Sequence, residues 1–392
     1  MRTIGVVTTS RADYSHYLPL LRAIIEDPEL RLDLIVSGMH LVPEFGLTVN
    51  EIEADGFPIA ARVETLLGSD TPEAIAKSMG LAVIGFAQLF AANRPDILIV
   101  LGDRFEMYAA ALAILPFNVP VAHIGGGDVT EGAIDECLRH GITKLSHLHF
   151  VASRQQEQRV LQMGEEPWRV MVTGELSLDL IHSFPKIPVE EMDRRFHFSF
   201  GNPFLLVTYH PVTLEYESAG AQIKQLLAAL NQINMPVLFT APNADTAGRI
   251  IARSIHEYVD SHPSCQLVVN MGASGYFTAM SLAAAMVGNS SSGVIEAASF
   301  RLPVVNIGTR QRGRLRGKNV IDCGYSSSEI VSSVKAAITG EFRASLDGLK
   351  NPYGTGDASN RILHRLRSLV NDNTLIFKRF VDVRVCEVHT DA

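Results

Sequence analysis

The chain has 392 residues, of which 47% are hydrophobic and 19% are charged. A single core rarely exceeds about 250–300 residues, so we expect two domains, and this composition excludes a disordered or fibrous chain. The net charge of −8 argues against a nucleic-acid-binding protein, which usually carries a basic stripe.

Neither the cysteines nor the apolar segments indicate secretion or a membrane. Four scattered cysteines show no metal-ligand spacing, which is typical of a reduced, cytoplasmic compartment; they are Cys137, Cys265, Cys323 and Cys386. The apolar run Ile4–Val7 is too short for a signal peptide, and no other run is expected to reach the ~18–20 residues that cross a bilayer. We therefore expect a soluble cytoplasmic protein without membrane or nucleic-acid partners.

The first half of the chain alternates short apolar runs with segments of helical spacing. The apolar runs predict strands at 4–8, 32–37, 97–101, 119–124, 148–152 and 170–173. Segments of helical length lie at 16–26, 72–93, 106–115, 134–146 and 154–163. This alternation predicts a parallel sheet with helices on both faces.

A polar, proline-bearing stretch at 183–203 is interpreted as a linker, after which the alternation restarts. Strands are expected at 204–209, 236–240 and 266–270, just before Gly288, and at 304–307 and 320–323. Helices are expected at 219–233, 245–259 and 277–285, from Gly293, and at 328–339 and 358–370. The pattern predicts two doubly wound, Rossmann-like α/β domains, residues 1–183 and 184–355, that face a central cleft with ligands at the strand ends.

Polar residues follow the first and fourth predicted strands. Hydroxyl and Asp caps in Thr8–Tyr14 are ordinary helix chemistry, but Arg11 beside a helix N-terminus is a natural phosphate contact. Strand 97–101 continues into Gly102 and Asp103, so we expect the Asp103 carboxylate to point into the cleft rather than to act only as a helix cap.

A glycine run at 125–127 allows a ligand to approach the backbone closely. Titratable residues surround this run: His123, Asp128, Glu131, Asp135, Glu136, Arg139 and His140. Asp135, Arg139 and His140 share a helical face or nearly so, and the alternative is a solvated charged face. His147 and His149 lie on an apolar strand and are interpreted as structural rather than as metal ligands.

The second half ends its strands in further polar groups. His210 closes one strand and Asn243 follows the next, where an amide suits a base or a ribose. Ser290 and Ser291 begin a helix and offer N–H and hydroxyl donors to an anion, and Glu296 suits ribose hydroxyls. A serine-capped helix without a ligand is the alternative.

Three common motifs lack support. Gly308–Arg314 differs from a P-loop because it has neither its Lys nor its Ser/Thr, and the chain contains neither G-x-G-x-x-G nor G-x-S-x-G. Dehydrogenase and α/β-hydrolase functions therefore lose their main support, and we expect no cofactor and no metal.

Taken together, these motifs resemble the hydrolysing UDP-N-acetylglucosamine 2-epimerases of sialic-acid-type sugar biosynthesis. The similar segments are 10–14, 37–41, 102–106, 134–147, 210–213, 242–245, 288–296 and 306–314. They follow the expected order over nearly the whole chain. The resemblance implies a glycosyltransferase-B-like fold, whose last helix, about 358–370 here, crosses back onto the first domain, and a homodimer or homotetramer.

The resemblance also implies a mechanism in which UDP is eliminated across C1–C2 and water is then added with C2 inverted. It makes Asp103 and Asp135 the acid/base candidates. The implied substrate-binding set is Arg11, His40, Arg104, His123, Arg139, His210, Asn243, Ser290, Ser291, Glu296 and Arg310. In this set His40 and Arg139 lie near the sugar, and the residues of the second half hold UDP together with Arg11.

One departure from the family pattern concerns position 125, where many members carry a catalytic Glu and this chain has Gly125. Acid/base work then falls to Asp103 or Asp135, or to a neighbour such as Asp128 or Glu131; the alternative is low activity on the standard substrate. Residues 130–136 are more similar to the branch that acts on UDP-2,4-diacetamido-2,4,6-trideoxy sugars and feeds legionaminic-acid-type pathways.

Three other functions fit parts of the same pattern. A UDP-sugar-dependent glycosyltransferase of this fold shares the UDP half-site but leaves the acidic cluster at 128–136 unexplained. A non-hydrolysing epimerase keeps UDP on its product. A UDP-sugar-binding regulator without catalysis is consistent with Gly125.

Overall fold

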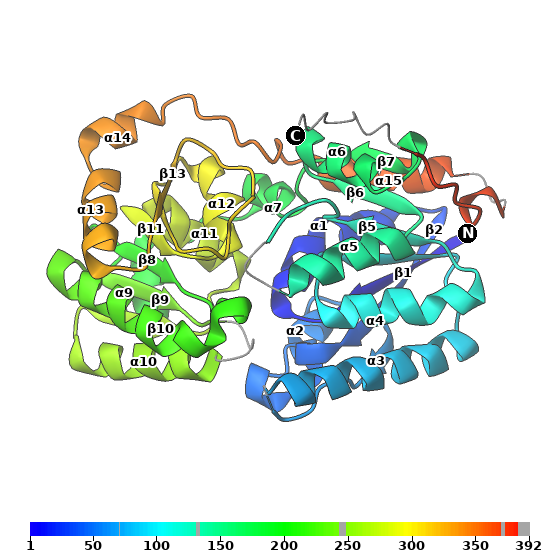
Figure 1. Ribbon diagram of the computed structural model, residues 1–392, viewed down its shortest axis with the longest axis horizontal. Coiled ribbons are helices and arrows are strands. Elements are labelled where there is room, and N and C mark those ends of the chain that lie inside the picture. The colour runs from blue at the N-terminus through cyan, green and yellow to red at the C-terminus, as the bar shows by residue number, and fades with distance from the viewer. Residues whose placement is uncertain (70, 131–133, 243–247, 370–372, 383–392) are drawn as a thin grey trace, which may run out of the picture.

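The computed structural model describes residues 1–69, 71–130, 134–242, 248–369 and 373–382. It contains two parallel sheets in two lobes that lie side by side (Figure 1). The first sheet has the order β3-β2-β1-β4-β5-β6-β7 and the second has the order β10-β9-β8-β11-β12-β13. In both sheets the strand order reverses at one point, as expected for doubly wound domains.

The first lobe is built from the N-terminal part of the chain. Its strands are β1 (Arg2–Thr8), β2 (Leu30–Ser37), β3 (Ile59–Val63), β4 (Ile97–Leu101), β5 (Val121–Ile124), β6 (Leu148–Val151) and β7 (Val170–Val172). Its helices are α1 (Arg11–Glu26), α2 (Val49–Ala54), α3 (Pro72–Ala92), α4 (Phe105–Ile114), α5 (Asp135–Leu145), α6 (Arg154–Gln162) and α7 (Ser177–Ser183). Ser10 and Asp13 fix where α1 begins, because each accepts a hydrogen bond within the first turn.

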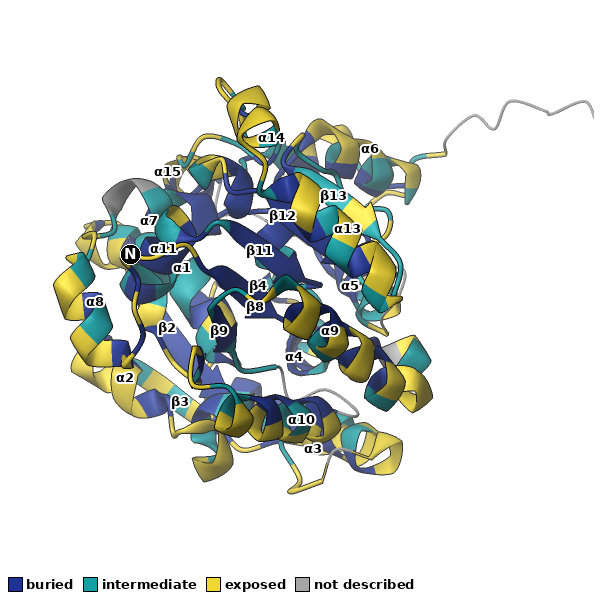
Figure 2. Cartoon of the chain, turned by 90° about the vertical axis from the view of Figure 1, so that its left-hand side faces the viewer, coloured by how far each residue is buried: buried dark blue, intermediate teal, exposed yellow. Residues whose placement is uncertain are grey.

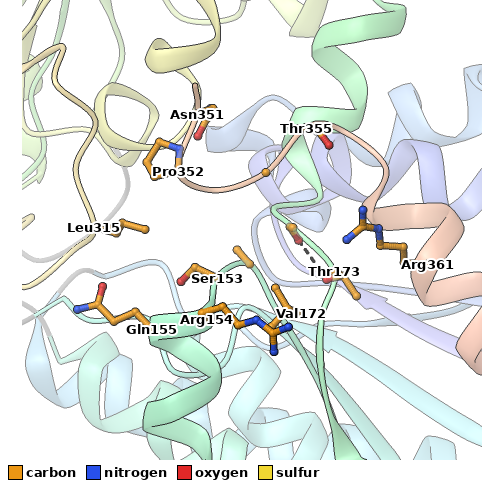
Figure 3. A pocket seen from close by; sticks show the side chains of 13 residues that line it. Ser153, Arg154, Gln155, Val172, Thr173, Leu315, Asn351, Pro352, Thr355 and Arg361 are labelled. Carbon is orange, nitrogen blue, oxygen red and sulfur yellow. Dashed lines mark hydrogen bonds between the residues drawn. The ribbon is translucent and has the colours of Figure 1, made fainter. Parts of the chain in front are cut away.

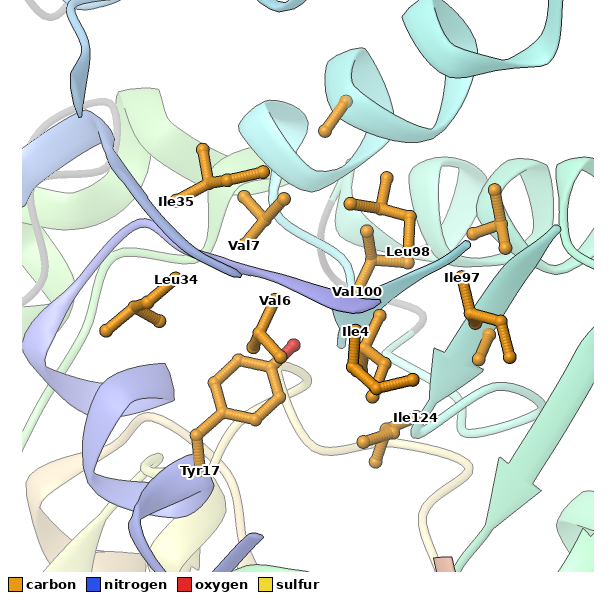
Figure 4. Packing of buried hydrophobic residues seen from close by; sticks show 14 of the residues in the cluster. Ile4, Val6, Val7, Tyr17, Leu34, Ile35, Ile97, Leu98, Val100 and Ile124 are labelled. Carbon is orange, nitrogen blue, oxygen red and sulfur yellow. The ribbon is translucent and has the colours of Figure 1, made fainter. Parts of the chain in front are cut away.

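The central strands of the first sheet are buried on both faces and are therefore continuous apolar runs rather than alternating ones. Val6 and Val7 on β1, and Leu98 and Ile99 on β4, are all fully buried. Figure 4 shows these strands packed with side chains above and below the sheet.

The second lobe repeats the arrangement. Its strands are β8 (Leu205–Thr208), β9 (Val237–Thr240), β10 (Cys265–Val268), β11 (Ala285–Gly288), β12 (Val304–Ile307) and β13 (Val320–Cys323). Its helices are α8 (Val189–Phe196), α9 (Ala219–Ile233), α10 (Gly248–Ser261), α11 (Gly272–Leu282), α12 (Ser291–Val294), α13 (Ser327–Ala337) and α14 (Gly340–Ser345).

Neighbouring residues of β8 enter different cores because side chains alternate across a sheet. Val207 packs with the helices α9, α10 and α13, whereas Leu206 packs with α8 and α11. In Figure 2 the strands β8, β11 and β12 are coloured as buried, while the outer faces of α9 and α10 are exposed.

The C-terminal helix α15 (Ala358–Ser368) returns to the first lobe. Its Ile362 and Leu366 are fully buried in the core of the first sheet. The carboxylate of Asp179 on α7 accepts hydrogen bonds from the first N–H groups of α15, at 2.9 and 2.7 Å, and so caps it. Arg367 forms an ion pair with Asp27 at the end of α1.

Several elements differ from the sequence prediction. Strand β3 was not predicted, because it is a half-exposed edge strand interrupted by Arg62. The stretch interpreted as a linker contains α8, which buries Met192 and Phe196. The helix expected from Gly293 is only the four-residue α12, followed by the 3₁₀ segment η6 (Ala297–Phe300).

The expectation that no segment is apolar and long enough to cross a membrane is also wrong. Among the described residues, α3 meets this criterion, with 21 residues and a mean hydropathy of 1.6. It buries Phe86 and Phe90 in the first core. A core helix of a soluble domain satisfies the same criterion, so α3 is weak evidence for a membrane.

Candidate active site

The predicted site residues follow the strands at which the two sheets reverse their order. Arg11 follows β1 and Asp103 follows β4, while His210 follows β8 and Ser290 follows β11. The two lobes are in contact here, because Arg11 Nη1 donates to the carbonyl of Val269 at 3.2 Å. Ligands of open α/β sheets bind at such points.

Arg139 is the centre of the site in the first lobe. It is only 1% exposed, and it forms ion pairs with Asp103 and, at 3.2 Å, with Glu136. Burial lowers the pKa of Arg139, and the nearby Arg314 and Arg310 lower it further, yet a guanidinium stays protonated in proteins. The side chain of Asp103 is 24% exposed, so a buried cation fixes a carboxylate that remains accessible. This arrangement suits proton transfer at a defined position.

Glu136 organises the same cluster, although the sequence prediction gave it no role. Its Oε2 accepts from the N–H of Thr130 at 2.5 Å, and its Oε1 lies 3.1 Å from Nε2 of His140. Burial raises its pKa, but the hydrogen bonds from His140 and the Thr130 N–H outweigh this and leave the pKa below its usual value. The i,i+3 and i,i+4 spacings to Arg139 and His140 are the signal that could have identified it.

The remaining acid/base candidates differ in their surroundings. Asp128 forms an ion pair at 2.9 Å with Arg314 of the second lobe, with side chains 11% and 9% exposed. Asp135 is the first residue of α5. Burial lowers the pKa of Arg314, but the charge of Asp128, with a smaller contribution from Asp135, outweighs this and leaves the pKa raised. Glu131 lies outside the described residues.

His40 and Arg104 support the site from its edge. His40 is fully buried, and its ring nitrogens lie 3.0 Å from Thr8 Oγ1 and 2.7 Å from Thr48 Oγ1. Burial lowers the pKa of His40, although Asp13 opposes this. Arg104 binds the buried Glu106 through two nitrogens, both at 3.2 Å. Both ring nitrogens of His40 therefore have a partner within the first lobe, and its place in the substrate-binding set stays a prediction.

His123 makes structural contacts within the first lobe, and its place in the substrate-binding set stays a prediction. It is fully buried, and its Nε2 donates to the carbonyl of Gly102 at 2.7 Å. Its Nδ1 lies 3.1 Å from Thr143 Oγ1. Burial lowers its pKa to about 3, so the ring is neutral. It fixes the turn that carries Asp103.

Gly125 has φ +84°, in the left-handed region that favours glycine. A Cβ built there would lie 3.8 Å from Gly102 Cα, which is ordinary contact. Gly125 therefore combines a special backbone conformation with room for a Cβ beside the turn that leads to Asp103.

In the second lobe, Asn289 connects two of the predicted binding residues. Its Oδ1 accepts from the N–H of His210 at 2.7 Å, and its Nδ2 donates to the His210 carbonyl at 2.8 Å. Its own carbonyl accepts from Arg310 Nη1 at 3.2 Å and from Gln311 Nε2 at 2.8 Å. Burial lowers the pKa of His210 well below its usual value, so this face of the site is held by neutral groups and Arg310.

Ser290 is the cap of α12, where its Oγ accepts from the N–H of Ser292 at 3.4 Å. The phenol of Tyr276 faces Ser290, Ser292 and Thr208; burial raises its pKa to about 12, although these three side chains oppose the rise. The sequence prediction missed Tyr276, because it comes from a different helix, α11. Asn243, the other predicted nucleotide contact, lies outside the described residues.

Glu296 lies at the contact between the lobes. It is 3% exposed, it accepts a hydrogen bond from the hydroxyl of Ser177, and His16 Nε2 lies 4.0 Å away. Nearby, desolvation and the charges of Glu296 and Asp128 raise the pKa of Glu175 to about 8. Carboxylates therefore gather where the two lobes meet.

A cavity of about 460 Å³ opens beside this region rather than at Ser290. Figure 3 shows it between Ser153 and Arg154 of the first lobe, Leu315 of the second, and the chain at Asn351 that leads to α15. It adjoins the loop that carries Arg314. Within the described ranges, no group of three or more His, Cys, Asp or Glu side chains is arranged to hold a metal ion.

Comparison with known proteins finds relatives that match nearly the whole chain. The chain is 37% identical over 385 residues to a Campylobacter jejuni protein named GDP/UDP-N,N'-diacetylbacillosamine 2-epimerase (hydrolyzing), covering 97% of this chain and 99% of the relative. It is 36% identical over 370 residues to the UDP-N,N'-diacetylbacillosamine 2-epimerase (hydrolyzing) of Legionella pneumophila, covering 94% and 96%.

The structure of UDP-GlcNAc 2-epimerase from Neisseria meningitidis bound to UDP-GlcNAc superposes with a TM-score of 0.81 at 17% identity, covering 94% of this chain and 100% of that chain. This confirms the glycosyltransferase-B-like fold. The family described as UDP-N-acetylglucosamine 2-epimerase matches residues 22–367. The chain therefore belongs to the UDP-N-acetylglucosamine 2-epimerase family.

Proposed function

We propose that the chain is a hydrolysing 2-epimerase of a UDP-linked 2-acetamido sugar. Its preferred substrate is UDP-2,4-diacetamido-2,4,6-trideoxyglucose, the chemical name of UDP-N,N'-diacetylbacillosamine, and UDP-N-acetylglucosamine is the second candidate. The observation that carries the proposal is the near full-length match to two relatives named for hydrolysing that nucleotide sugar. The accessible Asp103 beside the buried Arg139 supports it, because the reaction needs a base and a cation together.

The proposed reaction eliminates UDP and then adds water. A base takes the C2 proton, the C2–H electron pair forms the C1=C2 bond, and the C1–O bond breaks with its electrons leaving on UDP. Water then supplies a hydroxyl to C1 and a proton to C2 from the opposite face, which gives the free 2-epimeric sugar. We assign Asp103 to the C2 proton, because Arg139 fixes its carboxylate, and we keep Asp135 as its acid/base partner.

UDP would be held by the second domain, residues 184–355, against the first domain, residues 1–183 with α15. Ser290, Ser291 and Arg310 supply hydroxyl, N–H and guanidinium donors for the diphosphate. Glu131 and Asn243 keep the roles that the sequence predicts for them.

The deciding experiment is incubation with each nucleotide sugar in D₂O, followed by NMR of the products. A hydrolysing epimerase releases UDP and a 2-epimeric sugar that carries deuterium at C2. A non-hydrolysing epimerase gives the same label with UDP still attached, and a glycosyltransferase gives no label at C2. Binding without turnover would indicate a regulator. GDP-linked sugar is included, because the C. jejuni relative is named for both nucleotides.

The cellular setting forms part of the same proposal. We infer a cytoplasmic homodimer or homotetramer whose free sugar product enters a sialic- or legionaminic-acid-type pathway. A relative from Escherichia coli, 32% identical over 393 residues, is named polysialic acid biosynthesis protein P7, which supports this setting.

A further inference from the structure

The loop between β12 and β13 belongs to the second lobe, but one of its side chains is inserted into the first. Arg314 Nε donates to the carbonyl of Val129 at 3.0 Å, and its Nη2 donates to Thr130 Oγ1 at 3.2 Å. Arg314 also forms the nearly buried ion pair with Asp128. Arg159 reinforces this contact, because it donates to the carbonyls of Gly127 at 3.1 Å and Gly313 at 3.3 Å.

The hydroxyl oxygen of Thr130 is shared between two arginines. It accepts from Arg314 of the second lobe and, at 2.7 Å, from Arg139 Nη2 of the first. A hydroxyl oxygen has two acceptor positions, so these two guanidinium groups use both. The same nitrogen of Arg139 also binds Asp103. A continuous set of charged hydrogen bonds therefore runs from Arg314 through Thr130 and Arg139 to Asp103.

The other end of this loop supports the predicted nucleotide site. Arg310 and Gln311 both donate to the carbonyl of Asn289, the residue before Ser290. Arg316 stiffens the loop, because it donates to the carbonyls of Arg314 at 2.8 Å and Gln311 at 2.9 Å. One short loop therefore holds both the start of α12 and the residues that orient Asp103.

We propose that Arg314 is a positioning residue that couples binding of the nucleotide on the second lobe to the orientation of Asp103 on the first. It acts through Thr130 on Arg139, so contact between the lobes adds a further restraint on the cation that fixes the base. The role of Asp103 in this statement rests on the proposed function. The alternative is that Arg314 only holds the lobes together, and it predicts a different pattern of kinetic effects.

The test uses Arg314→Met, Arg314→Lys, Thr130→Val and the double variant, with Arg312→Met as the control. Arg312 is an exposed arginine two residues away on the same loop. We expect Arg314→Met to lower kcat by about 10–100-fold, because a small misplacement of a reacting group costs up to about 100-fold. The Kd for UDP, measured by calorimetry, should change by less than about threefold, and Arg312→Met should match the unmodified enzyme.

Two comparisons separate positioning from attachment. Arg314→Lys keeps a charge for Asp128 but cannot reproduce the planar, several-donor contact with Val129 and Thr130, so kcat stays low. Thr130→Val should also lower kcat, and adding it to Arg314→Met should lower kcat little further, because both changes interrupt the same path. Full recovery by lysine, additive losses, or an effect on KM alone would overturn the proposal.

A second measurement does not depend on catalysis. In hydrogen–deuterium exchange, UDP should protect peptides covering 121–130 and 135–145 in the unmodified protein. Arg314→Met should bind UDP without this protection. Persistent protection in the variant would overturn the coupling, whereas absence of any 2-epimer from the unmodified protein would overturn only the proposed function.

Discussion

Substitutions at Gly125 test two separate effects: the cost in stability of a side chain at a positive φ, and the effect of a carboxylate on substrate preference. With φ +84°, any L side chain costs roughly 1–2 kcal/mol. Replacing glycine also lowers the conformational entropy of the unfolded chain, which offsets this backbone cost by about 0.4–1 kcal/mol. The nearest atom to an added Cβ is 3.8 Å away, so no steric cost is added. Gly125→Ala should therefore destabilise the protein by about 1 kcal/mol, or ~2–4 °C in Tm for a domain of this size.

Gly125→Glu carries the same backbone cost and adds a carboxylate near Gly102 and Asp103. Bulk and negative charge there should oppose an acetamido group at C4 of the sugar. We expect the ratio of kcat/KM for UDP-2,4-diacetamido-2,4,6-trideoxyglucose over UDP-N-acetylglucosamine to fall about tenfold or more. Gly125→Ala is the matched control and should leave this ratio unchanged.

Competition kinetics with both nucleotide sugars and thermal unfolding of each variant measure these effects. An alanine variant as stable as the unmodified protein would refute the left-handed turn. An alanine variant that shifts the substrate ratio as much as glutamate does would refute the role of the carboxylate. A preference of the unmodified enzyme for UDP-N-acetylglucosamine would refute the enlarged pocket itself.

Three further predictions concern the nucleotide, the base and pH. Replacing Ser290 and Ser291 by alanine should weaken UDP binding by about 1–3 kcal/mol in calorimetric titration without unfolding the protein; unchanged affinity would contradict the nucleotide site. Asp103→Asn should lower turnover by about 100-fold or more while UDP affinity is nearly kept, and near-normal turnover would reduce Asp103 to a structural partner of Arg139. The pKa of Glu175, about 8 against an ordinary 4.5, means that the folded state keeps a proton that the unfolded state releases, so stability should fall as the pH rises through this window. The glutamine in Glu175→Gln cannot titrate, so the variant does not lose this stability. The unfolding free energy of the variant minus that of the unmodified protein should therefore increase by roughly 1–3 kcal/mol between pH 5 and pH 9 in thermal unfolding. A difference that stays constant with pH would refute the raised pKa.

The sequence predicts buried parallel strands well, because a strand that is buried on both faces is a continuous run of apolar residues. Strand β4 was predicted with its observed bounds, Ile97–Leu101. Edge elements carry a weaker signal, which is why β3, with Arg62 inside it, was missed. Helix α8 was missed because its short apolar face only becomes evident when it packs against the phenylalanines that follow it.

The residues of the candidate site also fall into those that a local sequence pattern indicates and those that only tertiary contacts reveal. Position at the ends of strands and helical spacing single out Asp103 and Arg139, and the structure pairs the two side chains. Contacts between the lobes depend on how two sheets face each other, which no local pattern encodes, so Arg314 and Glu175 were not identified. Burial is likewise not evident from the sequence for His40 and His123, since both look like ligands there and both are enclosed in the structure.

The return of α15 to the first lobe has a consequence for synthesis on the ribosome. The last strand of the first sheet ends at Val172, but the core of that sheet is closed only by residues from Ala358 onward. At about 5–20 residues per second, roughly 10–40 s separate the two events. The second lobe is complete in sequence before the first can close, so it should finish folding earlier. During that interval the apolar surface that α15 later covers on α1 stays open to water and to chaperones.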